Sequence, residues 1–138
     1  MNADFEIFEA GPVVKNTDRV HVTINKLGHI FLNRRTLEGL GEPDAVTLMY
    51  DRRRSIIGIM PSPLHRSHAY PLKRKDARTS RGRMVHAKNF CKHYAINPTE
   101  TLAFLSPEVN KDGILVLDLN DVRSVKKGVI DGSTPKRQ

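Results

Sequence analysis

The sequence predicts a mainly β fold with short helices, built from two tandem copies of a strand–strand–helix–strand–strand unit. Apolar residues alternate with polar ones over short stretches, which is typical of half-buried strands, whereas helical spacing occurs only in brief segments. Glycine, proline and asparagine separate these stretches. The order of elements around Gly28 recurs around Gly82, which indicates an internal repeat.

The first copy is expected to span residues 19–61. Its predicted elements are, in chain order, strands at 20–24 and 30–32, a helix at 34–40, and strands at 46–50 and 57–59. Gly28 supplies the permissive backbone for the turn between the first two strands. Asn33 is a good N-cap for the helix, and Gly41 is a natural C-terminal stop.

The second copy is expected to span residues 62–119. Its predicted elements are, in chain order, strands near 70–72 and 84–85, a helix at 87–94, and strands at 101–105 and 114–118. The helix carries the best apolar stripe in the chain, at i, i+3, i+4 and i+7 from Ala87 to Tyr94. The last two strands are expected to form a hairpin through the turn at 110–113.

The ends of the chain and its composition limit the class of protein. Residues 1–18 are expected to be a lead-in and residues 120–138 a flexible tail. No apolar run approaches the roughly 20 residues that a bilayer helix needs. The first residues are acidic where a targeting peptide is basic, so a cytoplasmic location is expected. A single cysteine, Cys91, excludes a disulfide scaffold.

The positive charge of the chain is concentrated in its second half. The 138 residues carry a formal net charge of +8. Basic and acidic residues balance up to Ser62, so the whole excess follows it, and it is densest between Arg66 and Lys92, where Asp76 is the only acid. Such a patch is typical of a site for a polyanion such as nucleic acid. The alternative is a solvated, mobile loop.

The first copy resembles the AbrB/SpoVT swapped-hairpin domain. The matching residues are the stretch Val22–Asn33, then Leu37 and Leu40-Gly41, then the hairpin through Ile59. The family reads as an apolar strand, Asp-x-x-Gly-Arg, an apolar pair, Leu/Ile-Pro, a short helix ending in Leu-Gly, and a β-hairpin. Residues 81–119 resemble it more weakly, and two copies in one chain look like the MraZ branch. The resemblance implies an interlocked swapped-hairpin β-barrel that binds duplex DNA with loop and strand arginines, often as a homo-oligomer.

Both copies depart from the recognition residues of this family. Asn25 and His29 stand where the first copy would have the motif's Asp and Arg. The second copy has Thr79 in place of the Asp but keeps Gly82-Arg83, so only Arg83 matches the DNA-contacting arginine. Glycine and apolar positions set the fold, whereas the polar pair sets recognition. An interaction or assembly module with the same barrel, which has lost sequence-specific DNA recognition, is therefore the alternative function.

The predicted DNA-binding residues are the basic side chains of the second copy's first loop, with two arginines of the first helix. They are Lys73, Arg74, Lys75, Arg78, Arg81 and Arg83, together with Arg34 and Arg35. Arginine in a projecting loop can bind phosphates or the guanine edge, and a helix N-terminus favours phosphate. Arg34 and Arg35 fit a plain exposed face equally well, and solubility explains Arg52–Arg54 better. An RNA-binding protein is a third hypothesis.

No pattern in the sequence indicates catalysis or a metal site. His65 and His68 lie in one loop, while His86, Cys91 and His93 lie around the second helix, and neither group has recognised ligand spacing. The sequence has no glycine-rich phosphate loop, no Gly-x-Ser-x-Gly and no paired-carboxylate spacing. We therefore expect no enzymatic activity, no metal and no cofactor.

Overall fold

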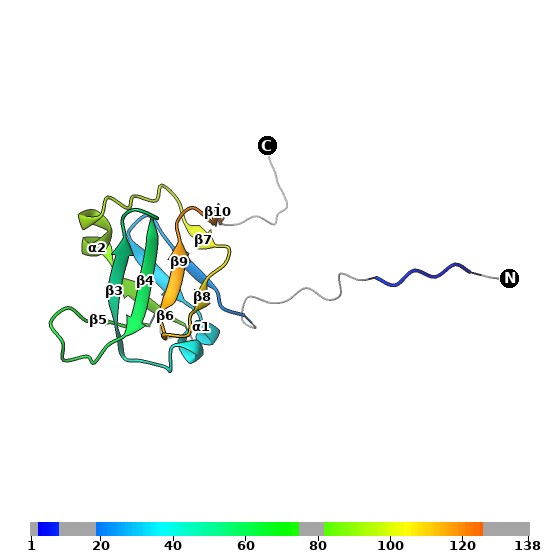
Figure 1. The fold of residues 1–138 in the computed structure, drawn as a ribbon. Helices are drawn as coiled ribbons and strands as arrows, with labels where there is room; N and C mark the ends of the chain where they lie inside the picture. Colours follow the sequence, from blue (N-terminus) through cyan, green and yellow to red (C-terminus); the bar gives the residue numbers. More distant parts are fainter. Residues whose placement is uncertain (1–2, 9–18, 75–81, 126–138) are drawn as a thin grey trace.

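The structure is a computed structural model that describes residues 3–8, 19–74 and 82–125. Two five-stranded antiparallel sheets form the body of the molecule (Figure 1). In spatial order, the first sheet contains β10 (Val122–Ser124), β7 (Leu102–Phe104), β1 (Val22–Ile24), β2 (His29–Leu32) and β6 (Arg83–His86). The second contains β5 (Tyr70–Pro71), β3 (Ala45–Asp51), β4 (Ile56–Pro61), β9 (Leu115–Asp118) and β8 (Glu108–Val109).

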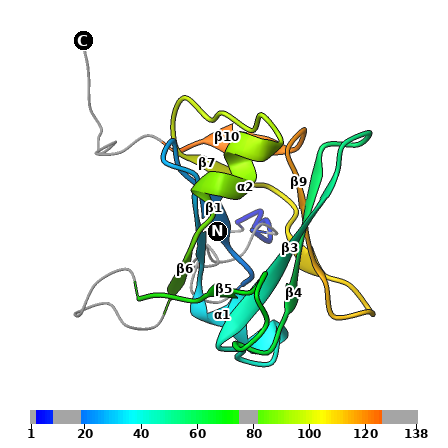
Figure 2. The same cartoon turned by 90° about the vertical axis from the view of Figure 1, so that its left-hand side faces the viewer.

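Two short helices, α1 (Arg34–Gly39) and α2 (Lys88–His93), complete the fold (Figure 2). The predicted mainly β fold with short helices is thus confirmed. No helix within the described ranges is long and apolar enough to span a membrane.

The two sheets enclose one hydrophobic core that both halves of the chain supply. The largest side chains with no exposed surface are Ile24, Ile30, Leu32, Ile57, Ile59, Leu115 and Leu117. They alternate with exposed or half-buried residues along their strands, as the period of two requires. Full burial of each such side chain contributes roughly 1.5–3 kcal/mol. The core therefore depends on both halves being folded together.

Strands of the two halves are interleaved in each sheet. The β1–β2 hairpin lies between β7 and β6, and the β3–β4 hairpin lies between β5 and β9. Both hairpins come from residues before Ser62, and all four flanking strands come after it. Ile30 pairs with Val85 and Ile57 with Leu117, so buried residues of the two halves lie directly opposite each other. Neither half can complete these pairings alone.

Local sequence signals explain the beginning of the fold. Gly28 has a φ of 81°, in the left-handed region that suits glycine, and it forms the turn between β1 and β2. Asn33 caps α1, since its side chain accepts a hydrogen bond from the Thr36 amide at 2.9 Å. Both features are as the sequence predicts.

The hydrogen bonds do not close the sheets into a single continuous barrel. They divide the described strands into two separate sheets. One isolated bridge, between Lys73 and Met84, joins the chain leaving β5 to the edge strand β6. The closed barrel that the family resemblance implies is therefore not formed as one ladder.

The prediction that the strands at 101–105 and 114–118 form a hairpin is wrong. The turn at 110–113 joins β9 to the two-residue β8, not to β7, which instead pairs with β1 and β10 in the first sheet. Pro107, between β7 and β8, cannot donate to a ladder, and it favours an extended conformation in the preceding residue. The chain here crosses from one sheet to the other. Four strands thus follow α2 where two were expected, and β10 lies inside the predicted tail at 120–138.

The predicted equivalence of the two halves differs by one residue at β2 and β6. If Gly28 of the first copy is aligned with Gly82 of the second, Ile30 becomes the equivalent of Met84. Ile30 is fully buried, whereas Met84 is half-buried and its neighbour Val85 is fully buried. Because side chains alternate between faces, a shift of one residue exchanges the buried and exposed positions. The turn glycine of the first half has therefore no simple counterpart in Gly82.

The Asn33 side chain makes several hydrogen bonds near the start of the fold, and a substitution tests their contribution to stability. Its Oδ1 accepts from the Thr36 hydroxyl at 2.6 Å as well as from the Thr36 amide, and its Nδ2 donates to the Arg19 carbonyl at 2.8 Å. Asn33→Ala should lower the free energy of unfolding by about 2–4 kcal/mol, because the variant has no cap and leaves buried polar groups without partners. Urea unfolding measures this change. Asn33→Asp keeps the acceptor and should be destabilised less, and equal destabilisation of both variants would contradict the role of the cap.

Candidate nucleic-acid interface

The ends of the most basic segment are held side by side. Lys73 and Met84 exchange two backbone hydrogen bonds, of 2.9 Å from the Lys73 amide and 2.6 Å from the Met84 amide. Lys73 and Arg74 are exposed at one end, and Arg83 begins β6 at the other. Of the remaining predicted DNA-binding residues of this segment, Lys75, Arg78 and Arg81 lie outside the described residues. The base of the predicted loop is thus attached to both sheets (Figure 2).

Arg83, the direct match to the family arginine, is the first residue of an edge strand. It pairs with the fully buried Leu32, and it lies on the same face of the sheet as Val85. Its side chain is half-buried, and its Nη1 donates to the Gly82 carbonyl at 2.9 Å. The guanidinium is therefore held against its own backbone at the end of the sheet.

Gly82 allows an aromatic side chain to pack on the backbone beside Arg83. A Cβ atom at Gly82 would clash with Cε1 and Cζ of Phe31. The glycine is therefore required by a close approach, and it does not have the positive φ seen at Gly28. This packing fixes where the basic segment rejoins the first sheet.

One row of residues runs across the strands of the first sheet, on its outer face, and has a basic residue at each end. Cross-strand pairing places the row in the order Lys73, Met84, Phe31, Thr23, Ala103 and Arg123. Directly paired residues share a face, so this row lies on the side of the sheet opposite the buried Val22 and Ile24, and Ala103 is buried within it. None of these six residues carries a carboxylate. With neighbouring strands about 4.8 Å apart, the two end residues are separated by roughly 24 Å along the sheet.

Two histidines stack beside this row. The rings of His29 and His86 are parallel within 13°, and their centroids are 4.2 Å apart. Burial lowers the pKa of His86, and His29 and Lys73 lower it further. The lowered pKa favours the neutral form of the His86 ring.

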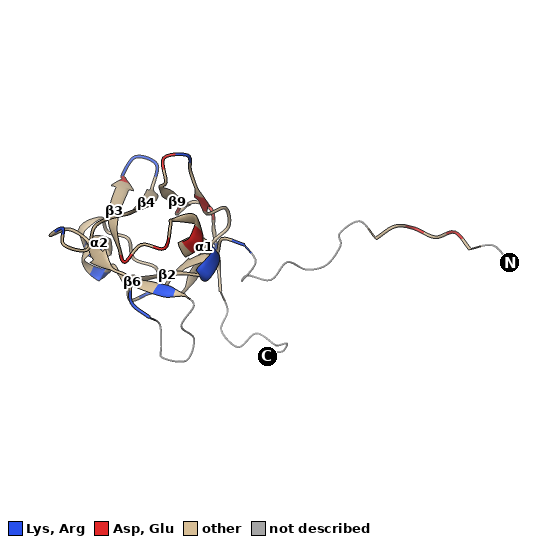
Figure 3. Cartoon of the chain, turned by 90° about the horizontal axis from the view of Figure 1, so that it is seen from below, with Lys and Arg blue, Asp and Glu red and all other residues tan. Residues whose placement is uncertain are grey.

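The two arginines of α1 share one acid. Arg34 Nε lies 3.1 Å from Glu38 Oε2, and Arg35 Nη1 lies 3.7 Å from Glu38 Oε1. Their combined charge is therefore partly balanced within the helix. Helix α1, which carries both arginines, lies on the other side of β2 from α2 (Figure 3).

The arginines at the β3–β4 tip make local interactions. Asp51 Oδ1 accepts from the amides of Arg53 and Arg54, its Oδ2 pairs with Arg54 Nη1 at 3.2 Å, and these hydrogen bonds hold the pKa of Asp51 below its ordinary value. The Arg52 guanidinium lies over the Tyr94 ring, 4.8 Å from its centroid. This tip points away from β6 (Figures 2 and 3).

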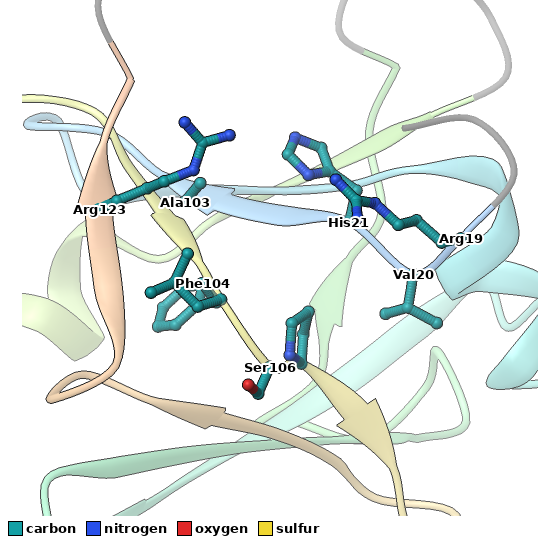
Figure 4. A pocket seen from close by; sticks show the side chains of 9 residues that line it. Arg19, Val20, His21, Ala103, Phe104, Ser106 and Arg123 are labelled. Carbon is teal, nitrogen blue, oxygen red and sulfur yellow. The ribbon is translucent and has the colours of Figure 1, made fainter. Parts of the chain in front are cut away.

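A second basic site, which the sequence does not predict, lies where β1 and β7 diverge. We call it the β1–β7 pocket; it measures about 330 Å³ and is lined by Arg19, Val20, His21, Ala103, Phe104, Leu105, Ser106, Pro107 and Arg123. β1 and β7 pair only at two positions, after which the Leu105 amide donates to the Asp121 carbonyl and the chain leaves toward β8. The strands therefore separate and leave a gap (Figure 4).

The β1–β7 pocket has a positive potential. Arg19 and Arg123 both extend toward the side that His21 faces (Figure 4). Burial lowers the pKa of His21, and the nearby charges of Arg19 and Arg123 lower it further. The sequence places Arg19 at the edge of the first copy and Arg123 in the expected tail, so no spacing in the sequence connects them.

The described residues offer little for metal or thiol chemistry. No three His, Cys, Asp or Glu side chains among them come together as metal ligands. Cys91 is a buried free thiol, and burial raises its pKa. A raised pKa disfavours the reactive thiolate.

No family model, curated protein or solved structure matches this chain. The resemblance to the AbrB/SpoVT domain therefore rests on the residues of the sequence alone. The residues that the structure brings together must carry any functional argument.

The packing of Phe31 on Gly82 can be tested by a double-mutant cycle. Gly82→Ala should lower the free energy of unfolding by about 1–3 kcal/mol, because the new methyl overlaps the Phe31 ring. In a Phe31→Leu background the same change should cost less, with a coupling of about 0.5–3 kcal/mol. Chemical unfolding of the four proteins gives the cycle. Additive effects would show that the ring does not limit the space at Gly82.

The electrostatics of the β1–β7 pocket can be tested by the titration of His21. Its pKa should lie below 6.5, and Arg123→Gln should raise it, whereas Arg54→Gln, which removes a guanidinium paired with Asp51 at the β3–β4 tip, should leave it unchanged. Because the unfolded histidine binds its proton more tightly, the contribution of His21 to stability should fall as the pH drops through about 6.5 and below. NMR titration measures the pKa of His21 in the parent protein and in each variant, and urea unfolding at several pH values measures the change in stability. A pKa of His21 that does not respond to Arg123→Gln would disprove the coupling.

Proposed function

We propose that this chain is a duplex-DNA-binding transcriptional regulator of the AbrB type. It contacts DNA mainly through the basic segment between Lys73 and Arg83. The observation that carries the proposal is the Lys73–Met84 bridge, which anchors both ends of the most basic part of the sequence at one edge of the first sheet.

The interleaving of the two halves supports a swapped-hairpin origin for the fold. Each hairpin of residues 19–61 is flanked on both sides by strands of the following residues. Two tandem copies that exchange hairpins within one chain would give this pattern. In this proposal the Lys73–Met84 bridge is one seam of the barrel, and the crossing from β7 to β8 is the other.

The outer face of the first sheet extends the DNA interface beyond the segment itself. The row from Lys73 to Arg123 has a cation at each end, the half-buried Phe31 between them, and no carboxylate among its six residues. A duplex carries one negative charge for about each 1.7 Å of its axis, so a row without acids avoids repulsion along its length.

A protein-interaction or assembly module is the alternative, and the first half favours it. Asn25 replaces the family Asp, and its side chain accepts from the Leu27 and His29 amides at 3.0 Å each, which closes the turn. His29 replaces the family Arg, and its ring stacks on His86. Both recognition positions of the first half are thus used within the protein.

DNA binding by the full chain should fall steeply as salt rises, because every phosphate that the protein neutralises releases counterions. Lys73→Gln/Arg74→Gln should weaken binding about tenfold at low salt and reduce the salt slope by about 1 for each phosphate that the variant no longer neutralises. Arg52→Gln/Arg53→Gln removes the same charge at the opposite tip and should change affinity about twofold or less. Fluorescence anisotropy with a labelled duplex measures these affinities.

Two results would contradict the proposal, and a third would change the partner. No binding at low salt would exclude DNA binding and favour the interaction module. Equal weakening by the two double variants would mean that only net charge matters, not the segment. Tighter binding of duplex RNA than of duplex DNA, in competition, would replace DNA with RNA.

A further inference from the structure

We propose that the β1–β7 pocket is a binding site for a phosphate group, which Arg19 and Arg123 hold between them. The site is separate from the basic segment and goes beyond the proposed function. It lies at the opposite edge of the first sheet, beside β10. Phosphate binding there does not depend on contact between DNA and Lys73 or Arg74.

The pocket is a built feature of the fold. β1 and β7 are held together at Thr23–Ala103 and Ile24–Leu102, and they separate beyond these pairs because Leu105 bonds to the turn before β10. On the other side, the amide of His21 is fixed by Asn33 Oδ1 at 3.3 Å and by Thr36 Oγ1 at 3.2 Å. Both walls are therefore attached to the sheet or to α1.

The lining divides into an apolar floor and a cationic rim. Val20 and Phe104 lie on one side of the gap, and the two guanidinium groups and the His21 ring lie on the other (Figure 4). Pro107 also lines the pocket. This arrangement suits a ligand with a charged head and a small uncharged remainder. The volume of about 330 Å³ is at the lower end of small-molecule sites, which span roughly 300–1,000 Å³.

The charges of the pocket favour an oxyanion. Among the described residues, no carboxylate lines it. On the elements beside it, Glu100 accepts from the Ser124 hydroxyl at 2.6 Å. The other nearby acid is Asp121, two residues before Arg123, and it does not line the pocket. Two guanidinium groups match the oxygens of a phosphate in charge and in hydrogen-bond geometry.

Inorganic phosphate titrated into the full chain tests the site. Phosphate should bind and shift the NMR signals of residues 19–21 and 103–107, and it should raise the pKa of His21, because a bound anion favours the imidazolium. Arg123→Gln should weaken phosphate binding at least about tenfold, whereas Arg54→Gln should leave it unchanged. Arg123 is exposed, and unchanged thermal unfolding of the variant would show that it still folds.

The same variants distinguish the source of the phosphate. If Arg123→Gln weakens phosphate binding and leaves DNA binding intact, the site takes a small phosphorylated molecule. If it weakens both, the pocket takes a phosphate of the nucleic-acid backbone. Failure of DNA binding with phosphate binding retained would reject only the proposed function. Absence of phosphate binding, or equal weakening of phosphate binding by Arg54→Gln and Arg123→Gln, would disprove the proposed phosphate site.

Discussion

The pairing of β2 with β6 and of β4 with β9 is the constraint on which the rest of the structure depends. Each pair joins the first half of the chain to the second, and each places fully buried residues opposite one another. A slip of one residue in either pair would turn its core residues outward. The register between the halves therefore decides which side chains form the core, and it also decides which ones remain on the outer face of the first sheet.

The candidate binding features follow from that register. β6 is an edge strand, so its outer backbone groups can form the bridge with Lys73 that anchors the basic segment. The same pairing brings Phe31 over Gly82 at the point where the segment enters β6. At the opposite edge, β7 must leave the sheet to reach β8, and the gap that results is the β1–β7 pocket. Both cationic regions are thus consequences of how the halves interlock.

The features that the sequence predicts correctly depend on residues close together in the chain. The turn at Gly28, the cap at Asn33 and the apolar stripe of α2 each involve only a few consecutive residues. The strands β8 and β10 and the partner of β7 could not be predicted, because short strands of two or three residues gain their stability from neighbours distant in sequence. The β1–β7 pocket could not be predicted either, because its lining residues are distant from one another in the sequence. The pairing of Arg34 and Arg35 with Glu38 was readable from helical spacing, and it weakens the case for these arginines as phosphate ligands.

The positions of the two cationic regions restrict how one nucleic acid could use both. Lys73 and Arg123 end the same row and are separated by roughly 24 Å, twice the width of about 12 Å that the major groove offers. A groove that crosses the row at right angles therefore cannot hold both ends. A duplex in that orientation would meet at least one of them through its backbone. Sequence reading would then belong to the basic segment alone, and Arg123 would set the orientation of the duplex. If the chain binds DNA as proposed, a small phosphorylated ligand in the β1–β7 pocket would compete with a backbone phosphate for Arg123. Such a ligand would then weaken DNA binding without contacting the basic segment.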